Sequence, residues 1–216
     1  MVKAAEPGLI SKAADVRRTT IEALGVMREP AALQRLMRFA KRRKRELEKD
    51  GDLHVLVIQS IGKHRSPLAL EFLSDKMLSS RPPQVIQARI LSIAQVRERA
   101  AVEALLKQMK ASDYRQVQNL MPHFQLALMR LTGHDAGKNA SLWQNWWRSV
   151  PKDWQVTDRA APLPREFQLR WDGYWGNRRK IQRNRSRQDR GQDPKDQGST
   201  GRDNAGRKRR GEDDGR

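Results

Sequence analysis

The sequence contains an internal repeat, and this feature restricts the fold more than any other. The pattern that begins at Ile21 returns 37 residues later at Ile58 and 69 residues later at Ile90, with a weaker copy at Leu128. Inside each copy, apolar residues recur at the three- and four-residue steps that place them on one face of an α-helix. Each copy corresponds to two helices joined by a turn, and such a pair is too small to bury its own apolar face. We therefore expect the copies to stack and to share one continuous core.

The prolines help to place the helix boundaries. Pro30 and Pro67 stand where the second helix of a pair begins, because proline lacks the N–H that the first turn of a helix leaves unbonded in any case. Pro122 should kink or divide the helical segment in which it lies, since it removes a backbone donor. The predicted helices cover residues 14–26, 30–48, 52–63, 66–79, 83–95, 98–110, 113–132 and 140–150.

Three short motifs in the first copy carry a family resemblance: DVR at 15–17, EALG at 22–25 and REPAAL at 28–33. They resemble the HEAT repeat, in particular its lyase-type HEAT-like subclass. The segment 131–147, which begins LTGHD and ends LWQNWW, is similar to the closing segment of many bacterial HEAT-repeat domains. The resemblance covers residues 14–150. It implies an all-α fold, a right-handed α-solenoid of about four HEAT-like helix pairs and a binding role, and it carries over no catalytic residue.

Two further segments flank or follow these repeats. Residues 1–13 form an N-terminal lead. Residues 177–216 contain 14 Lys and Arg against 7 Asp and Glu and no aromatic residue. Such a composition cannot bury enough apolar surface to offset the entropy lost on ordering, so we expect a disordered basic C-terminal tail.

Residues 151–176 form an aromatic-rich extension between the repeats and the tail. Pro162 and Pro164, with the alternation of Phe167 and Trp171 about Leu169, indicate an extended conformation. A flexible linker would not normally carry so many large apolar groups. We expect the segment to pack back onto the solenoid; the alternative is a short linear motif that docks on a partner.

Basic side chains are concentrated in the first predicted helix pair. The whole chain has a formal net charge of +19, and residues 41–45 form its densest basic run outside the tail. Five consecutive cations cover all sides of a helix, which is more than a favourable interaction with the helix dipole needs. The run is either a solvated helix end or a surface that contacts phosphates. The candidates for contact with phosphate or another partner are Arg17, Arg18, Arg35, Arg38, Lys41, Arg42, Arg43, Lys44 and Arg45.

Trp143, Trp146 and Trp147 are spaced so that they lie on one face of a helix. One interpretation is a cap that closes the core of the last repeat, because terminal repeats must differ from internal ones. The other is a platform on which a base stacks, as in the HEAT-like DNA alkylation-repair glycosylases. We favour the cap.

No motif in the sequence indicates an enzyme. Cysteine is absent, the four histidines lack the spacing of metal ligands, and no paired carboxylates or nucleophile motif stands out, so we expect neither metal nor cofactor. The leading hypothesis is a non-enzymatic binding or scaffold module for a protein partner. The alternative is sequence-independent nucleic-acid binding through the basic body and tail, and the third is a HEAT-like DNA glycosylase. No signal peptide and no membrane-spanning stretch is visible, so we expect a cytoplasmic location.

Overall fold

The computed structural model describes residues 6–80, 82–114 and 118–176, and these residues are helical with no β-strand among them. The chain separates into two units, Met1–Gly176 and Asn177–Arg216, and all that follows concerns the first. The predicted all-α fold is confirmed, whereas the predicted disordered tail lies outside the described residues. The helices are α1 (Glu6–Leu9), α2 (Ala14–Val26), α3 (Pro30–Arg42), α4 (Lys44–Lys49), α5 (Gly51–Lys63), α6 (Leu70–Ser74), α7 (Pro83–Ile93), α8 (Arg99–Tyr114), α9 (Met121–Thr132), α10 (Ala140–Ser149) and α11 (Arg165–Tyr174). Short 3-10 turns cover Pro67–Ala69 (η2), Met77–Ser79 (η3) and Gln118–Leu120 (η4).

Local sequence signals start and stop several of these helices. The Asp50 carboxylate accepts a hydrogen bond from the Leu53 N–H at the start of α5, and the Asn139 side chain accepts from the N–H groups of the first turn of α10. Both satisfy backbone donors that a helix N-terminus leaves free. Pro122 lies in the first turn of α9, so the prediction that it divides its segment is confirmed. Gly133 ends α9 in the left-handed conformation, at φ 72°, that glycine adopts without strain.

Two predicted helices are interrupted. The predicted helix 30–48 breaks at Arg43 into α3 and α4, where like charges at 41–45 disfavour a continuous helix. The predicted helix 66–79 becomes η2, α6 and η3, with Lys76 in the left-handed region at φ 45°. Both breaks bear on function, because α4 and η3 help to line the groove described below.

Two other boundaries were predicted wrongly. Residue 113 belongs to α8, which continues to Tyr114, rather than to the following helix. Residues 165–174 form a helix, α11, rather than an extended strand-like run. Pro164 directly precedes this helix, where proline is tolerated, and Phe167, Trp171 and Tyr174 are spaced at helical steps of four and three. The alternation about Leu169 was therefore coincidental.

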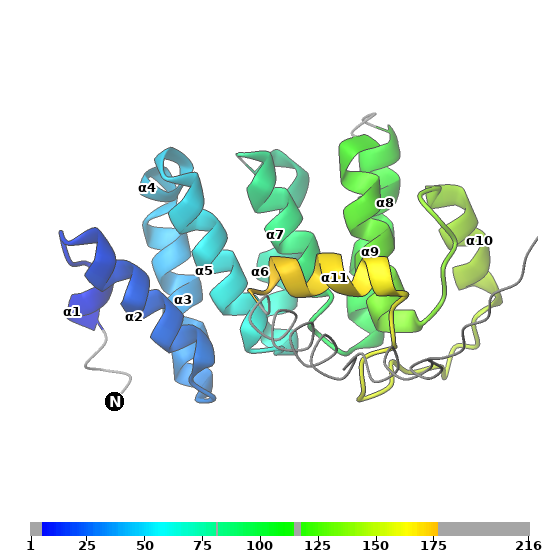
Figure 1. Cartoon of the computed structure of the whole chain (residues 1–216), viewed down its shortest axis with the longest axis horizontal. Helices are drawn as coiled ribbons and strands as arrows, with labels where there is room; N and C mark the ends of the chain where they lie inside the picture. Colours follow the sequence, from blue (N-terminus) through cyan, green and yellow to red (C-terminus); the bar gives the residue numbers. More distant parts are fainter. Residues whose placement is uncertain (1–5, 81, 115–117, 177–216) are drawn as a thin grey trace, which may run out of the picture. The chain divides into compact units, whose positions relative to one another are not determined.

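The first helices of successive pairs pack against one another in chain order, α2 on α5, α5 on α7 and α7 on α9 (Figure 1). Glycines allow the closest approaches. A Cβ at Gly25 would stand 2.8 Å from the Ser60 Cβ, and one at Gly62 would stand 2.6 Å from the Ser92 Cβ. Gly25 and Gly62 occupy corresponding positions in the sequence repeat, so the repeat has a direct counterpart in helix packing. The second helices also touch in series, with α6 on α8 and α8 on α10.

In the part of the chain that the structure describes, no helix is both long enough and apolar enough to cross a membrane.

Candidate functional site

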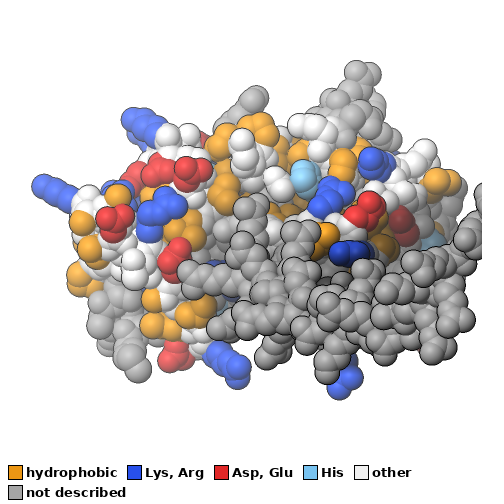
Figure 2. Space-filling view, viewed as in Figure 1, with side chains coloured by type: hydrophobic (Ala, Val, Ile, Leu, Met, Phe, Trp, Pro, Cys, Tyr) orange, Lys and Arg blue, Asp and Glu red, His pale blue; other side chains and the backbone are white. Residues whose placement is uncertain are grey.

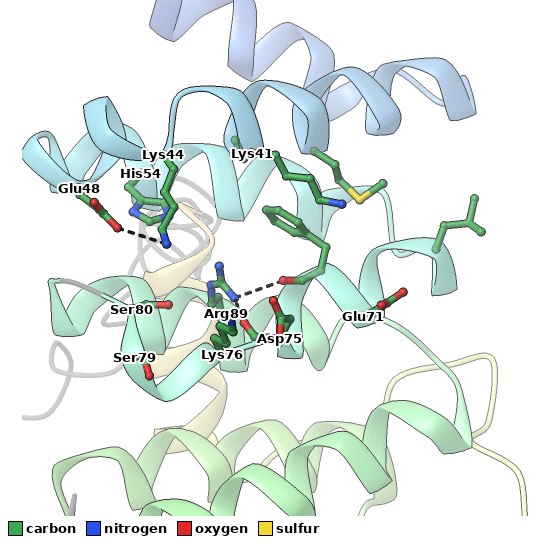
Figure 3. A pocket seen from close by; sticks show the side chains of 14 residues that line it. Lys41, Lys44, Glu48, His54, Glu71, Asp75, Lys76, Ser79, Ser80 and Arg89 are labelled. Atoms are coloured by element: carbon green, nitrogen blue, oxygen red, sulfur yellow. Dashed lines mark hydrogen bonds and ion pairs between the residues drawn. The ribbon is translucent and has the colours of Figure 1, made fainter.

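A groove of about 360 Å³ separates the second helix of the first pair from that of the second pair (Figure 3). Side chains of α3 and α4 form one wall, and those of η2, α6 and η3 form the other. His54 of α5 and Arg89 of α7 complete the lining. We call this feature the α3–α6 groove; its lining residues are Met37, Ala40, Lys41, Lys44, Glu48, His54, Leu68, Glu71, Phe72, Asp75, Lys76, Ser79, Ser80 and Arg89.

The groove changes character along its length. Met37 and Ala40 come first along α3, and Leu68 and Phe72 come first along the opposite wall, so apolar groups form one end. At the other end lie Glu48, which Figure 3 shows near His54, and the two serines of the η3 region on the opposite wall. Leu68 has 64 % of its surface exposed, which leaves it free to contact a partner.

Arg89 holds the α6 wall in place. Its Nη1 donates hydrogen bonds to the carbonyl oxygens of Phe72 at 3.2 Å, Leu73 at 3.3 Å and Asp75 at 2.9 Å. These carbonyls belong to the C-terminal end of α6, where a cation is favoured. Burial lowers the pKa of Arg89, and the neighbouring Asp75 charge opposes that shift. Arg89 is therefore a structural cation of the groove.

The remaining charges of the groove are of both signs. Lys44 lies 3.8 Å from a Glu48 carboxylate oxygen. Lys41 on α3, Glu71 on α6 and Lys76 form no ion pair with any described residue. Lys41 points into the space between the walls, and Glu71 lies on the opposite wall (Figure 3). Exposed charges of this kind contribute little to folding and are available to a ligand.

The structure does not bring the predicted basic residues together in one place, and Arg17, Arg18 and Arg45 line neither of the two hollows described next. Lys41 and Lys44 line the α3–α6 groove, whereas Arg35, Arg38, Arg42 and Arg43 line a smaller hollow beside α1. Several are already paired with carboxylates. Arg17 and Arg43 both contact Glu46, at 3.2 and 3.3 Å, and Arg35 contacts Glu6 at 3.0 Å. The members without an ion pair to a described residue are Arg18, Arg38, Lys41, Arg42 and Arg45.

The predicted tryptophan cluster is packed into the protein. Trp143 is fully buried, and its Nε1 donates a 2.8 Å hydrogen bond to the Gly137 carbonyl. The ring of Trp146 stacks on His134 with 4.6 Å between centroids, and the Trp154 ring meets Trp146 and Trp147 edge-on. Trp143 is buried and cannot offer its face to a base, and the half-buried Trp146 and Trp147 rings pack against Trp154, so these contacts favour the cap over the stacking platform.

Sequence reasoning missed a set of arginines that hold the segment 151–161. Arg97 donates from Nε to the Thr157 carbonyl at 2.7 Å and from Nη2 to the Arg159 carbonyl at 3.0 Å. Arg99 donates to the carbonyls of Pro151 and Trp154, at 2.9 and 3.2 Å, and Arg130 donates to that of Ala161 at 2.9 Å. Arg97 corresponds in the repeat to Arg28 and Arg65, but the carbonyls that it binds have no signature in the sequence.

The same extension covers part of the first-helix face. Trp171 of α11 is buried, and the Arg130 guanidinium lies 5.3 Å from the centre of its ring. The Gln59 side chain of α5 donates to the Tyr174 carbonyl at 3.4 Å. Burial raises the pKa of the Tyr174 phenol. Residues 151–176 are thus held by α5, α8 and α9.

No group of three or more His, Asp or Glu side chains that could hold a metal ion occurs among the described residues. Comparison of the chain with protein-family models, with curated proteins and with solved structures gives no match.

Proposed function

We propose that residues 14–150 form an α-solenoid of HEAT-like helix pairs that acts as a non-enzymatic binding module for a protein partner. The serial packing of α2, α5, α7 and α9 supports stacked pairs, as does the equivalent close approach at Gly25 and Gly62. In stacked helix pairs, the second helices provide an extended binding surface.

The observation that carries the binding role is the α3–α6 groove. It lies between second helices, it exposes Leu68 beside Met37 and Phe72, and it presents unpaired charges of both signs. Its volume of about 360 Å³ falls in the range of roughly 300–1,000 Å³ that ligand pockets occupy. An exposed apolar anchor flanked by polar groups is the usual composition of a protein interface.

Mixed charge favours a protein over a nucleic acid as the partner of the groove. Glu48, Glu71 and Asp75 would repel phosphates that approached Lys41 and Lys44. On the face shown in Figure 2, basic side chains of the described residues are interspersed with acidic and apolar ones and form no continuous stripe. A phosphate backbone would be better served by a stripe of one sign.

Peptide selection on the full-length chain tests this function. A random peptide library displayed on phage is enriched on the immobilised protein, and individual clones are then assayed on Leu68→Asp and on Leu142→Asp. Leu142 is the matched control because it is 54 % exposed but lies on α10, away from the groove. We expect clones that bind the wild-type protein and the Leu142 variant but not the Leu68 variant. Binding that is equal on all three would exclude the groove as the binding surface.

A second candidate function, nucleic-acid binding, is favoured by the unpaired cations outside the groove. Arg38, Arg42 and Arg45 are exposed and form no ion pair with the described residues. To test it, binding of labelled duplex DNA and single-stranded RNA is measured across a salt series. The double variant Arg42→Glu/Arg45→Glu is compared with the control Lys107→Glu/Lys110→Glu on α8. A salt slope that becomes shallower only in the first variant would support this function; equal slopes in both variants would attribute any binding to nonspecific charge.

A further inference from the structure

The protein itself shows how it holds an extended segment of chain. Along 151–161, the side chains of Arg97, Arg99 and Arg130 donate hydrogen bonds to main-chain carbonyls. An extended peptide needs such partners, because its backbone N–H and C=O groups have none of their own. A surface that binds extended peptides should therefore offer donors or acceptors for the main chain.

The α3–α6 groove offers few fixed groups of this kind. The described residues that line it include no Asn or Gln, their hydroxyl groups are confined to Ser79 and Ser80 at one end, and their single guanidinium, Arg89, already donates from Nη1 to three carbonyls of the α6 wall. Its exposed cations are lysines, which are compact charges without the planar fork of arginine. A helix satisfies its own backbone hydrogen bonds, so a surface that binds a helix needs to contact only its side chains. The lining of the groove is thus suited to a helix.

The apolar end of the groove fits one face of such a helix. Met37 on α3 faces Leu68 and Phe72 across the groove, and all three keep exposed or half-buried apolar surface. Apolar side chains one helical turn apart on a ligand would contact both walls together, as in other helix-in-groove complexes.

The charges beside this apolar end differ between the walls. Lys41 stands on the α3 side, and Glu71 stands on the α6 side; neither is paired with a described residue. Figure 3 shows the two side chains on opposite walls. Lys44 reinforces the positive sign of the first wall, although Glu48 partly offsets it. On the second wall, Asp75 and Lys76 carry opposite charges, so Glu71 leaves that wall with a net negative charge. A helix lying between the walls would meet a cation on one flank and a carboxylate on the other.

We propose that the α3–α6 groove binds an amphipathic helix of a protein partner, with an apolar stripe between an acidic flank and a basic flank. The acidic flank faces Lys41, and the basic flank faces Glu71. This arrangement fixes the direction in which the partner helix lies, because the reversed helix would place like charges together. The inference rests on the proposed binding function and adds the class and orientation of the ligand.

The probe for this inference is a small three-helix bundle that is displayed on phage and has one exposed helix face randomised. The bundles are selected on the whole chain of residues 1–216, and a linear peptide library is selected in parallel. The best bundles are labelled with fluorescein, and affinity is measured by fluorescence anisotropy. We expect the enriched faces to carry an apolar stripe with acidic residues on one side and basic residues on the other. Leu68→Asp should weaken binding at least about tenfold, and Leu142→Asp should leave it unchanged.

Charge reversal then tests the orientation. Lys41→Glu should weaken a selected bundle about two- to fivefold, and reversal of the acidic flank of the bundle to lysine should restore the affinity. Glu71→Lys should weaken the bundle by a similar factor, and reversal of the basic flank of the bundle to glutamate should restore the affinity. Lys107→Glu on α8 is the matched control, since Lys107 is an exposed helical lysine outside the groove.

The outcomes separate the inference from the proposed function. Leu68-dependent binders that come only from the linear library, or that ignore both charge reversals, would overturn the helical and oriented ligand while leaving the binding module intact. Absence of Leu68-dependent binders from both libraries would overturn both. Helical binders whose affinity is restored by the matching reversals would establish the inference.

Discussion

The α3–α6 groove and the C-terminal end of the described helices use similar elements in opposite ways. At the C-terminal end, α8, α9 and α10 are covered by the segment 151–161, and Arg97, Arg99 and Arg130 bind its carbonyls. At the groove, Lys41 and Glu71 have no ion-pair partner among the described residues, and Leu68 is largely exposed. One region is filled by the chain itself, and the other is left open.

This difference separates residues that stabilise the fold from residues available to a ligand. A guanidinium that donates to main-chain carbonyls ties two parts of the chain together, so its loss should lower the free energy of unfolding. An exposed lysine without a partner contributes little to stability, so its loss should leave folding unchanged and affect binding alone. Substitutions in the two regions should therefore have separable effects.

The largest effect on stability should come from Trp143→Ala at the filled end. The indole is fully buried and donates to the Gly137 carbonyl, so truncation leaves both a cavity and an unpaired acceptor. We expect the free energy of unfolding to fall by about 3–5 kcal/mol, measured by urea denaturation followed by circular dichroism. Leu142→Ala, one residue earlier and exposed, is the control and should change stability by less than about 0.5 kcal/mol. Equal values for the two variants would mean that the tryptophan cap does not support the fold.

Gly62→Ala should have the next largest effect, because it acts on the packing between the two regions. The new Cβ would lie 2.6 Å from the Ser92 Cβ and 3.0 Å from its backbone Cα, so α5 and α7 would have to move apart. We expect a loss of about 1–3 kcal/mol in the same urea assay.

Gly173→Ala on α11 provides the control for that substitution. A Cβ there meets no atom within 4 Å, and alanine favours a helix over glycine by about 1 kcal/mol. This variant should be as stable as the wild-type protein or slightly more stable. A destabilised Gly173 variant would show that the loss at Gly62 does not report helix–helix contact.

Arg97→Ala should release the segment 151–161 at a smaller cost to global stability. The carbonyls of Thr157 and Arg159 are at the surface and can bind water instead, so the loss should be about 1 kcal/mol. Locally, trypsin should cleave after Arg159 faster than in the wild-type protein, as followed by mass spectrometry. Arg28→Ala is the matched control, because Arg28 occupies the equivalent repeat position, is exposed and forms no ion pair with the described residues. Unchanged cleavage in the Arg97 variant would contradict its role as a clamp.

The periodic part of the fold could be predicted from the sequence, and its interruptions could not. The apolar spacing and the prolines gave α2 its bounds of Ala14–Val26, identical to the predicted range. The break before Lys76 accompanies contacts with a distant residue, because Arg89 of α7 donates hydrogen bonds to the carbonyls at the end of α6. The apolar period of a helix does not predict such contacts, so helix boundaries that depend on tertiary structure cannot be predicted from it.

For the same reason, only part of the candidate site could be predicted from the sequence. Lys41 and Lys44 stood out as part of a basic run, but Leu68 and Phe72, which belong to the next repeat, were not singled out. Only the juxtaposition of α3 and α6 shows that these apolar residues line the same groove as the lysines. The arginine clamps were missed because their acceptors are main-chain carbonyls, which have no signature in the sequence.

The smallest expected effect is a pH dependence of the free energy of unfolding that comes from His64, in the turn between α5 and the α6 wall. His64 Nε2 donates to the Leu24 carbonyl at 3.0 Å, and burial lowers the pKa of His64 below its ordinary value of 6.5 despite that hydrogen bond. The unfolded chain therefore takes up a proton at a higher pH than the folded protein does. It follows that this contribution to stability is complete above pH 6.5 and decreases as the pH falls below it.

His64→Gln retains an amide donor for the Leu24 carbonyl but cannot titrate, so the free energy of unfolding should depend less on pH between 7 and 5 in this variant. Burial and the Arg170 charge also lower the pKa of His123, which adds a second contribution of the same sign from the region covered by α11. Urea denaturation at several pH values measures both contributions when it is carried out on His64→Gln, on His123→Gln and on the double variant. A double variant with the wild-type slope would show that neither histidine couples folding to pH, whereas a change in the His64 variant alone would place the response on the groove side of the molecule.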